Sequence, residues 1–283
     1  MVKKQKWARG SNQYVKRSRT GRSDSSTESR LIRDKSEIVR QLEDTGVSWS
    51  QFGVEQIRPS EIERIRFRFK SHLPELIWNT AALEGNNFTL PEVKTLLEGV
   101  TVGGRRLDDA QQILALSDAY SRLDALVGAG EFALTKSVSD ELHGLLARHE
   151  AIESGSFRGE REVTGGGTVR LASGGVVQGT PHGKGGELLR GHFDQLISYL
   201  DSIDDPRQRA LIYFASAVRR QLYFDGNKRT ARLMMTGELM SSGFEFVSVP
   251  FARKLEFNEA LDVLFSRDDA TDLLRFLSTC VLD

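Results

Sequence analysis

A turn of five residues between two long helical patterns is the feature that most constrains how this chain folds. The first pattern covers residues 206–222, the second covers residues 228–242, and YFDGN separates them. Asp205 and Pro206 suit the N-cap and first position of the first helix, and Gly243 suits the end of the second. The sequence therefore predicts two helices that meet at a tight turn.

Most of the remaining chain also follows helical spacing. Ile62, Ile65 and Phe69 repeat at that spacing, and the run continues past Pro74 to a stop at Gly85. Strands are few, so the predicted fold class is mainly α. Similar helical patterns cover residues 91–99, 108–128, 135–149, 187–203, 255–265 and 268–281.

A glycine-rich segment, residues 154–186, interrupts the helical series. Two short β-like runs lie among its glycines, REV at 161–163 and TVRLA at 168–172. This pattern predicts a small β-hairpin flap, about residues 157–183, within one domain.

The first 35 residues differ in composition from the rest. They contain eleven Lys or Arg and three acidic residues, with Ser, Thr and Gly between them. Such a segment buries too little apolar surface to order itself, so we expect a basic, disordered tail over residues 1–35. A basic arm for nucleic acid or an acidic partner is the alternative. Residues 36–283 are predicted to form a single helical domain.

Properties of the whole chain exclude several classes of protein. The 39 basic and 39 acidic side chains give zero net charge, so overall charge points to no partner. No run of about eighteen apolar residues and no secretory leader is visible, so we expect no membrane association. Cys280 is the single cysteine and can form no internal disulfide, which favours a cytoplasmic location.

The turn has the composition of a phosphate site. A helix N-terminus offers unpaired backbone N–H groups, and Gly226 lets the backbone approach a ligand closely. Asp225 suits Mg²⁺, and Asn227 can donate its amide to a phosphate oxygen. An Asp-Gly-Asn turn with a solvated basic face is the alternative. Positive charge is added by Lys228, Arg229 and Arg232.

The stretch QLYFDGNKRTAR, residues 221–232, resembles the core motif of Fic proteins, HxFx(D/E)GNxRxxR. Tyr223 stands for the family's aromatic residue, and DGN and both arginines match. Upstream, TAALEGN at residues 80–86 resembles the inhibitory motif (S/T)xxxE(G/N) that some Fic proteins carry. The resemblance covers about residues 60–280 and implies a helical bundle with a β-hairpin flap.

The resemblance implies a role for each matching residue. Most characterised Fic proteins transfer AMP from ATP to a hydroxyl group of another protein. Asp225 would hold Mg²⁺, and Gly226 and Asn227 would grip the phosphates of ATP. Arg229 would also face the phosphates, and Arg232 would hold the γ-phosphate. A target protein with an exposed hydroxyl would dock on the flap as an added strand.

A second set of roles belongs to the inhibitory motif, which comprises Thr80, Glu84, Gly85 and Asn86 in this chain. Thr80 and Glu84 are four residues apart and hence on one face of a helix. Glu84 can pair bidentately with Arg232 and remove that arginine from the γ-phosphate. The resemblance therefore implies an autoinhibited protein.

Two residues depart from the Fic pattern. Gln221 stands where the family has the histidine that acts as general base, and an amide cannot carry a proton away, so we expect impaired catalysis. Lys228 stands where AMP-transferring members usually have glycine, whereas the related Doc toxins, which transfer phosphate, have lysine. Lys228 is counted among the nucleotide-binding residues, and the reaction type stays open. His182, at the end of the flap, is the one conceivable substitute base.

Three functions are compatible with these observations. The first is a Fic enzyme with altered chemistry: transfer of AMP or phosphate, or removal of AMP with Glu84 positioning water. The second is a non-catalytic nucleotide-binding module with a signalling or regulatory role. The third, a nucleic-acid-associated protein acting through the tail, has no recognition helix to support it. Dimers are frequent in such families, so a homodimer is possible, although the sequence shows no interface.

Overall fold

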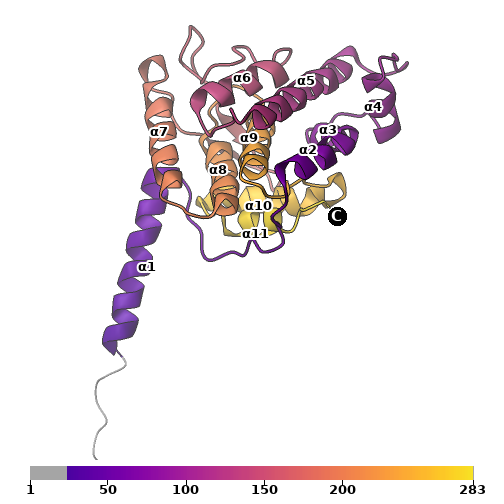
Figure 1. Cartoon of the computed structure of the whole chain (residues 1–283). Helices are drawn as coiled ribbons and strands as arrows, with labels where there is room; N and C mark the ends of the chain where they lie inside the picture. The colour runs from indigo at the N-terminus through magenta and orange to yellow at the C-terminus, as the bar shows by residue number, and fades with distance from the viewer. Residues whose placement is uncertain (1–23, 283) are drawn as a thin grey trace, which may run out of the picture. The chain divides into compact units, whose positions relative to one another are not determined.

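The computed structural model describes residues 24–282, and helices dominate them (Figure 1). One short antiparallel hairpin accompanies the helices, with Val169 of β1 opposite Val177 of β2. The predicted class, mainly α with a small β-hairpin, is confirmed. The elements are α1 (Asp24–Thr45), α2 (Ile62–Ser71), α3 (Leu73–Leu83), α4 (Leu90–Leu97), α5 (Leu107–Ala129), α6 (Lys136–Leu146), β1 (Thr168–Arg170), β2 (Val176–Gln178), α7 (Glu187–Asp201), α8 (Pro206–Arg220), α9 (Asn227–Ser241), α10 (Lys254–Arg267) and α11 (Thr271–Ser278).

Contacts group the described residues into two units, one ending at Glu37 and one beginning at Ile38. Helices α8 and α9 lie side by side at the centre of the second unit (Figure 1). Helices α5 and α6 pack against α9, while α7, α10 and α11 pack against α8. Every side chain from Asn227 to Met240 is buried except Lys228 and so lies within this packing. The turn that joins α8 to α9 is therefore attached to a buried helix.

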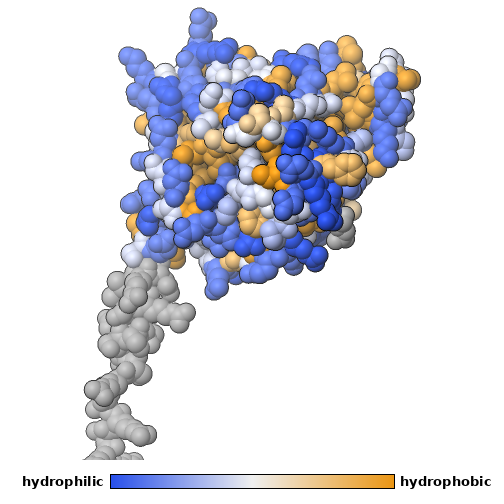
Figure 2. All heavy atoms as spheres, viewed as in Figure 1, coloured by the Kyte–Doolittle hydropathy of each residue, from blue (hydrophilic) through white to orange (hydrophobic). Residues whose placement is uncertain are grey.

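The outer surface is mainly polar in the view of Figure 2. Apolar side chains are gathered in that view over the end of the molecule where α4 and α5 lie. None of the helices that the structure describes is long and apolar enough to cross a membrane. The large apolar side chains lie mostly in the core, which runs from Val47 to Cys280.

The helical run predicted after Ser60 consists of two helices. α2 ends at Ser71 and α3 begins at Leu73, with Pro74 near its start. Proline fits there because the first turn of a helix leaves its N–H groups without an intrahelical partner. α3 ends at Leu83, two residues before Gly85, whose φ of +93° suits glycine. The predicted interruption and the predicted stop both appear.

The hairpin differs from its prediction in the choice of strands. β1 falls within the predicted run TVRLA, but REV at 161–163 forms no strand. Gly174 and Gly175, with φ of +89° and +107°, reverse the chain shortly after β1. The partner strand must therefore follow β1, and it does so as β2.

Part of the expected tail is helical. Residues 1–23 lie outside the described residues, but α1 begins at Asp24, so residues 24–35 are helical where disorder was expected. The stretch 24–45 contains no Gly or Pro and mixes acidic with basic residues, whereas residues 1–23 contain no acidic residue. The prediction treated residues 1–35 as one segment, although residues 1–23 and 24–35 differ in composition.

Leu239 on α9 tests the importance of the central helix pair. Its side chain is fully buried, so Leu239→Ala should lower the free energy of unfolding by about 2–5 kcal/mol. Leu255→Ala is the matched control, because Leu255 is 71% exposed, and it should change that energy little. Denaturant titration measures both. Equal losses in the two variants would contradict the central place of α9.

Candidate functional site

A cavity of about 480 Å³ lies at the mouth of the turn between α8 and α9. Its wall is built from the end of α3, strand β1, the turn and α10. A volume of this size lies in the range of small-molecule sites. The lining includes Glu84 from the end of α3, Val169 from β1, Asp225 from the turn, Lys228 from the start of α9 and Leu261 from α10.

Backbone conformation places the turn. Gln221 has φ of +54°, which is uncommon for a residue other than glycine, and Gly226 has φ of +73°. α9 begins directly after Gly226, and no side chain of the described residues caps it. The first backbone N–H groups of α9 therefore have no intrahelical partner and are available to an anion at the cavity.

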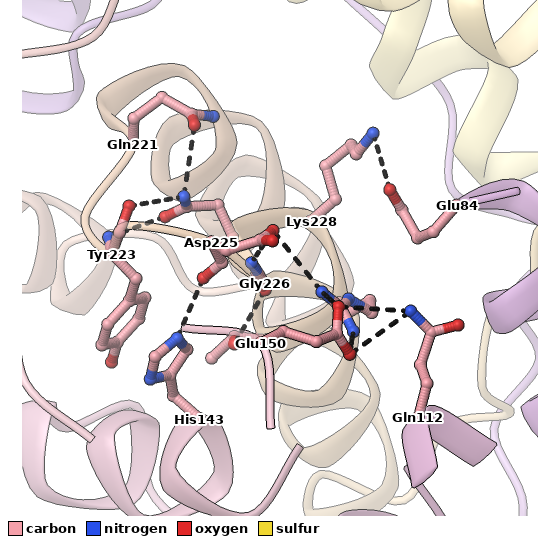
Figure 3. Close-up of polar contacts among 12 residues, drawn as sticks. Glu84, Gln112, His143, Glu150, Gln221, Tyr223, Asp225, Gly226 and Lys228 are labelled. Atoms are coloured by element: carbon pink, nitrogen blue, oxygen red, sulfur yellow. Dashed lines mark hydrogen bonds and ion pairs between the residues drawn. The ribbon is translucent and has the colours of Figure 1, made fainter. Parts of the chain in front are cut away.

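Asn227 organises the turn from within. Its Oδ1 accepts a hydrogen bond from the Tyr223 N–H at 2.8 Å, and its Nδ2 donates to the Tyr223 carbonyl at 2.8 Å. The same Nδ2 donates to Oε1 of Gln221 at 3.2 Å (Figure 3). Both hydrogens of the amide are thus used inside the protein. In the described structure the amide that was predicted to bind phosphate fixes the turn from within.

Gln221 lies at the cavity wall with its side chain bound at both ends. Its Nε2 donates to the carbonyl of Val218 at 2.7 Å, while its Oε1 accepts from Asn227. In these contacts the amide behaves as a structural connector. It offers no group with the proton affinity of a general base.

His143 lies beneath the turn and was not predicted as part of the site. Its Nδ1 accepts from the Gly155 N–H at 2.8 Å, so the hydrogen is on Nε2, which donates to the Asp225 carbonyl at 2.9 Å. The ring is stacked on Tyr223, with centroids 3.7 Å apart. Burial lowers the pKa of His143 to about 4, although the bond to Asp225 opposes it. His143 is a neutral support of the turn.

His182, the conceivable substitute base, is occupied elsewhere. Its Nδ1 bonds the carbonyl of Gly183, and its Nε2 accepts from the Gly165 N–H at 3.3 Å. It is not among the residues that line the cavity. Neither bond involves Gln221.

Glu84 meets two cations at the cavity rim. Its Oε2 lies 2.9 Å from Lys228 Nζ (Figure 3), and its Oε1 lies 3.3 Å from Arg232 Nη2. The structure brings Glu84 and Arg232 together, but through one contact and not bidentately, because Lys228 takes the other oxygen. Burial acts to raise the pKa of Glu84, but the charges of Lys228, Arg232 and Arg229 outweigh it and lower that pKa to about 2. The carboxylate is ionised at neutral pH.

The other residues of the inhibitory motif hold α3 in place. Thr80 Oγ1 is 2.9 Å from the hydroxyl of Tyr120 and does not contact Glu84. Asn86 Nδ2 donates to the carbonyl of Asp109 at 2.9 Å and to the side chain of Gln112. These contacts attach the end of α3 to α5. They fix the backbone from which Glu84 projects.

Arg229 is engaged by a residue that the sequence did not indicate. Its Nη1 and Nη2 each donate to one oxygen of Glu150 at 2.7 Å, and Gln112 also contacts Glu150 (Figure 3). Glu150 lies beyond α6, 79 residues before Arg229, and belongs to neither motif. The phosphate contact expected of Arg229 would have to share the guanidinium with Glu150.

Asp225 is the residue best placed for a metal. Its side chain is 59% exposed, and its Oδ1 accepts from the Gly226 N–H while its Oδ2 bonds no described residue. Within residues 24–282 no group of three His, Cys, Asp or Glu could hold a metal ion by itself. Mg²⁺ is commonly held by one or two carboxylates together with substrate phosphates. Asp225 therefore fits Mg²⁺ only if a phosphate completes the set.

The flap tip is anchored across the cavity on α10. Oδ1 and Oδ2 of Asp262 accept from the N–H groups of Ala172 at 3.0 Å and Ser173 at 2.7 Å. Asp262 and β1 both line the cavity. The anchor holds the hairpin as one wall of the site, and no motif marked Asp262 in the sequence.

No protein-family model matches this chain. It is 26% identical over 208 residues to protein adenylyltransferase Fic of Aedes aegypti and 29% identical over 208 residues to that of Drosophila ananassae. Each match covers 72% of this chain and 39% of the relative. The chain thus spans about two fifths of the length of these curated relatives.

Solved structures show the same fold. A Fic domain containing signaling protein from Bacteroides thetaiotaomicron has a TM-score of 0.63 at 20% identity, covering 87% of this chain and 91% of that one. Fic-1 from C. elegans has a TM-score of 0.61 at 19% identity, covering 91% of this chain and 75% of that one. The predicted resemblance to Fic proteins is confirmed.

His143 gives the site a testable pH dependence. Its pKa falls from an ordinary 6.5 to about 4 on folding, so its contribution to stability is present above about pH 6.5 and is lost as pH falls toward 4. His143→Gln keeps a neutral side chain. The excess stability of wild type over this variant should shrink by about 2 kcal/mol between pH 7.5 and pH 5, measured by denaturant titration. A difference that is the same at both pH values would contradict the buried neutral state.

Proposed function

We propose that this chain is a Fic-family protein that binds ATP with Mg²⁺ as an AMP-transferring type, autoinhibited by Glu84 and impaired by Gln221. The relatives named protein adenylyltransferase support the reaction class. A hydroxyl group of a target protein would be the acceptor, and β1 at the cavity rim supports docking along the flap.

One observation carries the proposal: the uncapped start of α9 faces a cavity whose lining includes a carboxylate held by two cations. Lys228 and Arg232 are the cations, and Glu84 is the carboxylate. Nε and Nη1 of Arg232 are buried without a hydrogen-bond partner in the described residues. Unused buried donors beside a bound anion are what a phosphate site with a substitute occupant would show.

The chain's own residues then divide the work. With Glu84 displaced, the first N–H groups of α9, Lys228 and Arg232 would bind phosphate oxygens, and Asp225 would hold Mg²⁺. Mg-ATP would supply the AMP group, and pyrophosphate would be the leaving group. Gln221 can orient the target hydroxyl through its amide but cannot accept its proton, which would have to pass to solvent. Phosphoryl-type transfer depends mainly on positioning and charge, so a slow reaction is compatible with this site.

A non-catalytic nucleotide-binding module is the second candidate. It is favoured by the amide of Gln221, which is bound to Val218 and Asn227 as a structural group. In such a module ATP would compete with Glu84 for Lys228 and Arg232, and the release of Glu84 would change a surface read by a partner. The side chain of Lys228 at the mouth keeps Doc-like phosphate transfer as the alternative chemistry.

Labelled ATP separates the two candidates. Wild type, Glu84→Gly, Gln221→His and the double variant are incubated with Mg²⁺ and lysate, and labelled protein is measured. A general base contributes on the order of 10²–10⁴-fold, so the double variant should label at least about 100-fold faster than Glu84→Gly. Equal labelling by these two would show that Gln221 does not impair the reaction. No label in any variant, with thermal stabilisation by ATP, would favour the module.

Affinity for ATP tests the anion site without chemistry. Glu84→Gln removes the negative charge that Lys228 and Arg232 bind, so affinity for Mg-ATP should rise about tenfold, a change equal to about 1.4 kcal/mol. Isothermal titration calorimetry measures it. Glu92→Gln is the control, because Glu92 pairs with Arg105 away from the cavity. An unchanged or weakened affinity in Glu84→Gln would contradict autoinhibition by this residue.

A further inference from the structure

Arg158 is a buried cation that the described residues hold by carbonyl groups alone. It is 2% exposed. Its Nε donates to the carbonyl of Gln221 at 2.6 Å, and its Nη2 donates to that of Thr180 at 2.7 Å. Its Nη1 donates to the carbonyls of Gly165 and Gly166 at 3.2 and 3.1 Å. A buried charge is retained at a cost, so the four carbonyls must offset it.

The four carbonyls come from three separate pieces of the site. Gly165 and Gly166 lie on the arm that leads into β1, and Thr180 lies on the arm that leaves β2. Gln221 begins the turn before α9 and has the uncommon φ of +54°. Main-chain bonds add to this junction, because the Arg158 N–H donates to the Leu222 carbonyl at 2.9 Å. One guanidinium thus joins both arms of the flap to the turn.

Glycines allow the flap to close around this group. A Cβ on Gly167 would lie 2.5 Å from Arg158 Cζ, and one on Gly179 would lie 2.6 Å from Gln221 Cβ. Both distances are shorter than real Cβ contacts. By contrast, a Cβ on Gly174 at the flap tip would meet nothing within 4 Å. The glycines at the flap base therefore serve the packing around Arg158, and the tip has no such constraint.

We propose that Arg158 is a positioning residue that makes the flap base and the turn at Gln221 move as one unit. A displacement of either flap arm moves the guanidinium and weakens its bond to the carbonyl of Gln221, whose backbone is left-handed. A shift of the turn likewise weakens the bonds from the guanidinium to the flap arms. A target strand on the flap would therefore affect the turn that starts α9. The inference has two parts. The coupling of flap and turn stands by itself, and its effect on nucleotide binding, called the nucleotide half below, rests on the proposed function.

Arg158→Lys tests the coupling. Lysine keeps the charge, but one ammonium cannot reach four carbonyls on three segments. Hydrogen–deuterium exchange with mass spectrometry should show amides of residues 165–180 and 221–226 exchanging about tenfold faster together, with α9 to α11 unchanged, since a bond to a charged group contributes on that scale. Arg209→Lys is the control and should alter neither region, because Arg209 binds Glu238 and Ile203 at the other end of α8.

A second pair of variants leaves Arg158 in place. Gly167→Ala should displace the guanidinium and accelerate exchange in both regions, whereas Gly174→Ala, which is equally strained with φ of +89°, should affect the flap tip alone. Faster exchange in the flap with an unchanged turn would overturn the coupling. Faster exchange in every helix would also overturn it, because Arg158 would then be a general stabiliser.

The nucleotide half is tested in the Glu84→Gln background. Arg158→Lys should weaken binding of Mg-ATP about tenfold by calorimetry, and Arg209→Lys should leave it unchanged. Unchanged binding in Arg158→Lys would overturn the link to the nucleotide. Absence of ATP binding in every variant would refute the proposed function instead, and the exchange data, which need no nucleotide, would still decide the coupling.

Discussion

Residues 221–226 connect α8 to α9 through a turn whose polar groups are bound from inside the protein. Asn227 holds the backbone of Tyr223, and His143 holds the carbonyl of Asp225 from below. Hydrogen bonds in a buried setting must be made, because an unpaired group there is costly. These bonds fix the turn, so the N–H groups at the start of α9 that have no intrahelical partner are held at the cavity.

Charge around this turn is balanced by carboxylates from distant parts of the chain. Arg229 has Glu150 as its partner, while Lys228 and Arg232 share Glu84. Under the proposed function, each carboxylate would occupy a cation that a phosphate would otherwise use. Binding of a nucleotide would then be an exchange of anions, and its affinity would depend on how easily Glu84 leaves. Lys228 would matter twice, because it holds Glu84 and lines the cavity where a phosphate would bind.

Much of the fold and part of the site were predictable from the sequence. Helical spacing, with the stops at Pro74 and Gly85, predicted the helices. The two motifs predicted that Glu84 meets Arg232. The hydrogen-bond partners were not predictable. His143, Glu150 and Asp262 act on the site from other elements, and no motif marks them in the sequence. The predicted phosphate role of Asn227 likewise missed that its amide is used inside the turn.

The sequence by itself determined the helical class, the flap and a turn suited to anions, because spacing, glycines and caps act over a few residues. It also determined that Gln221 brings an amide and not a base to the turn. Only the tertiary structure decided which charges meet. Lys228 pairs with one oxygen of Glu84, and Glu150 pairs with Arg229. Arg158 joins the flap to the turn through hydrogen bonds. These pairings join residues far apart in the chain, so they exist only once packing has placed the helices.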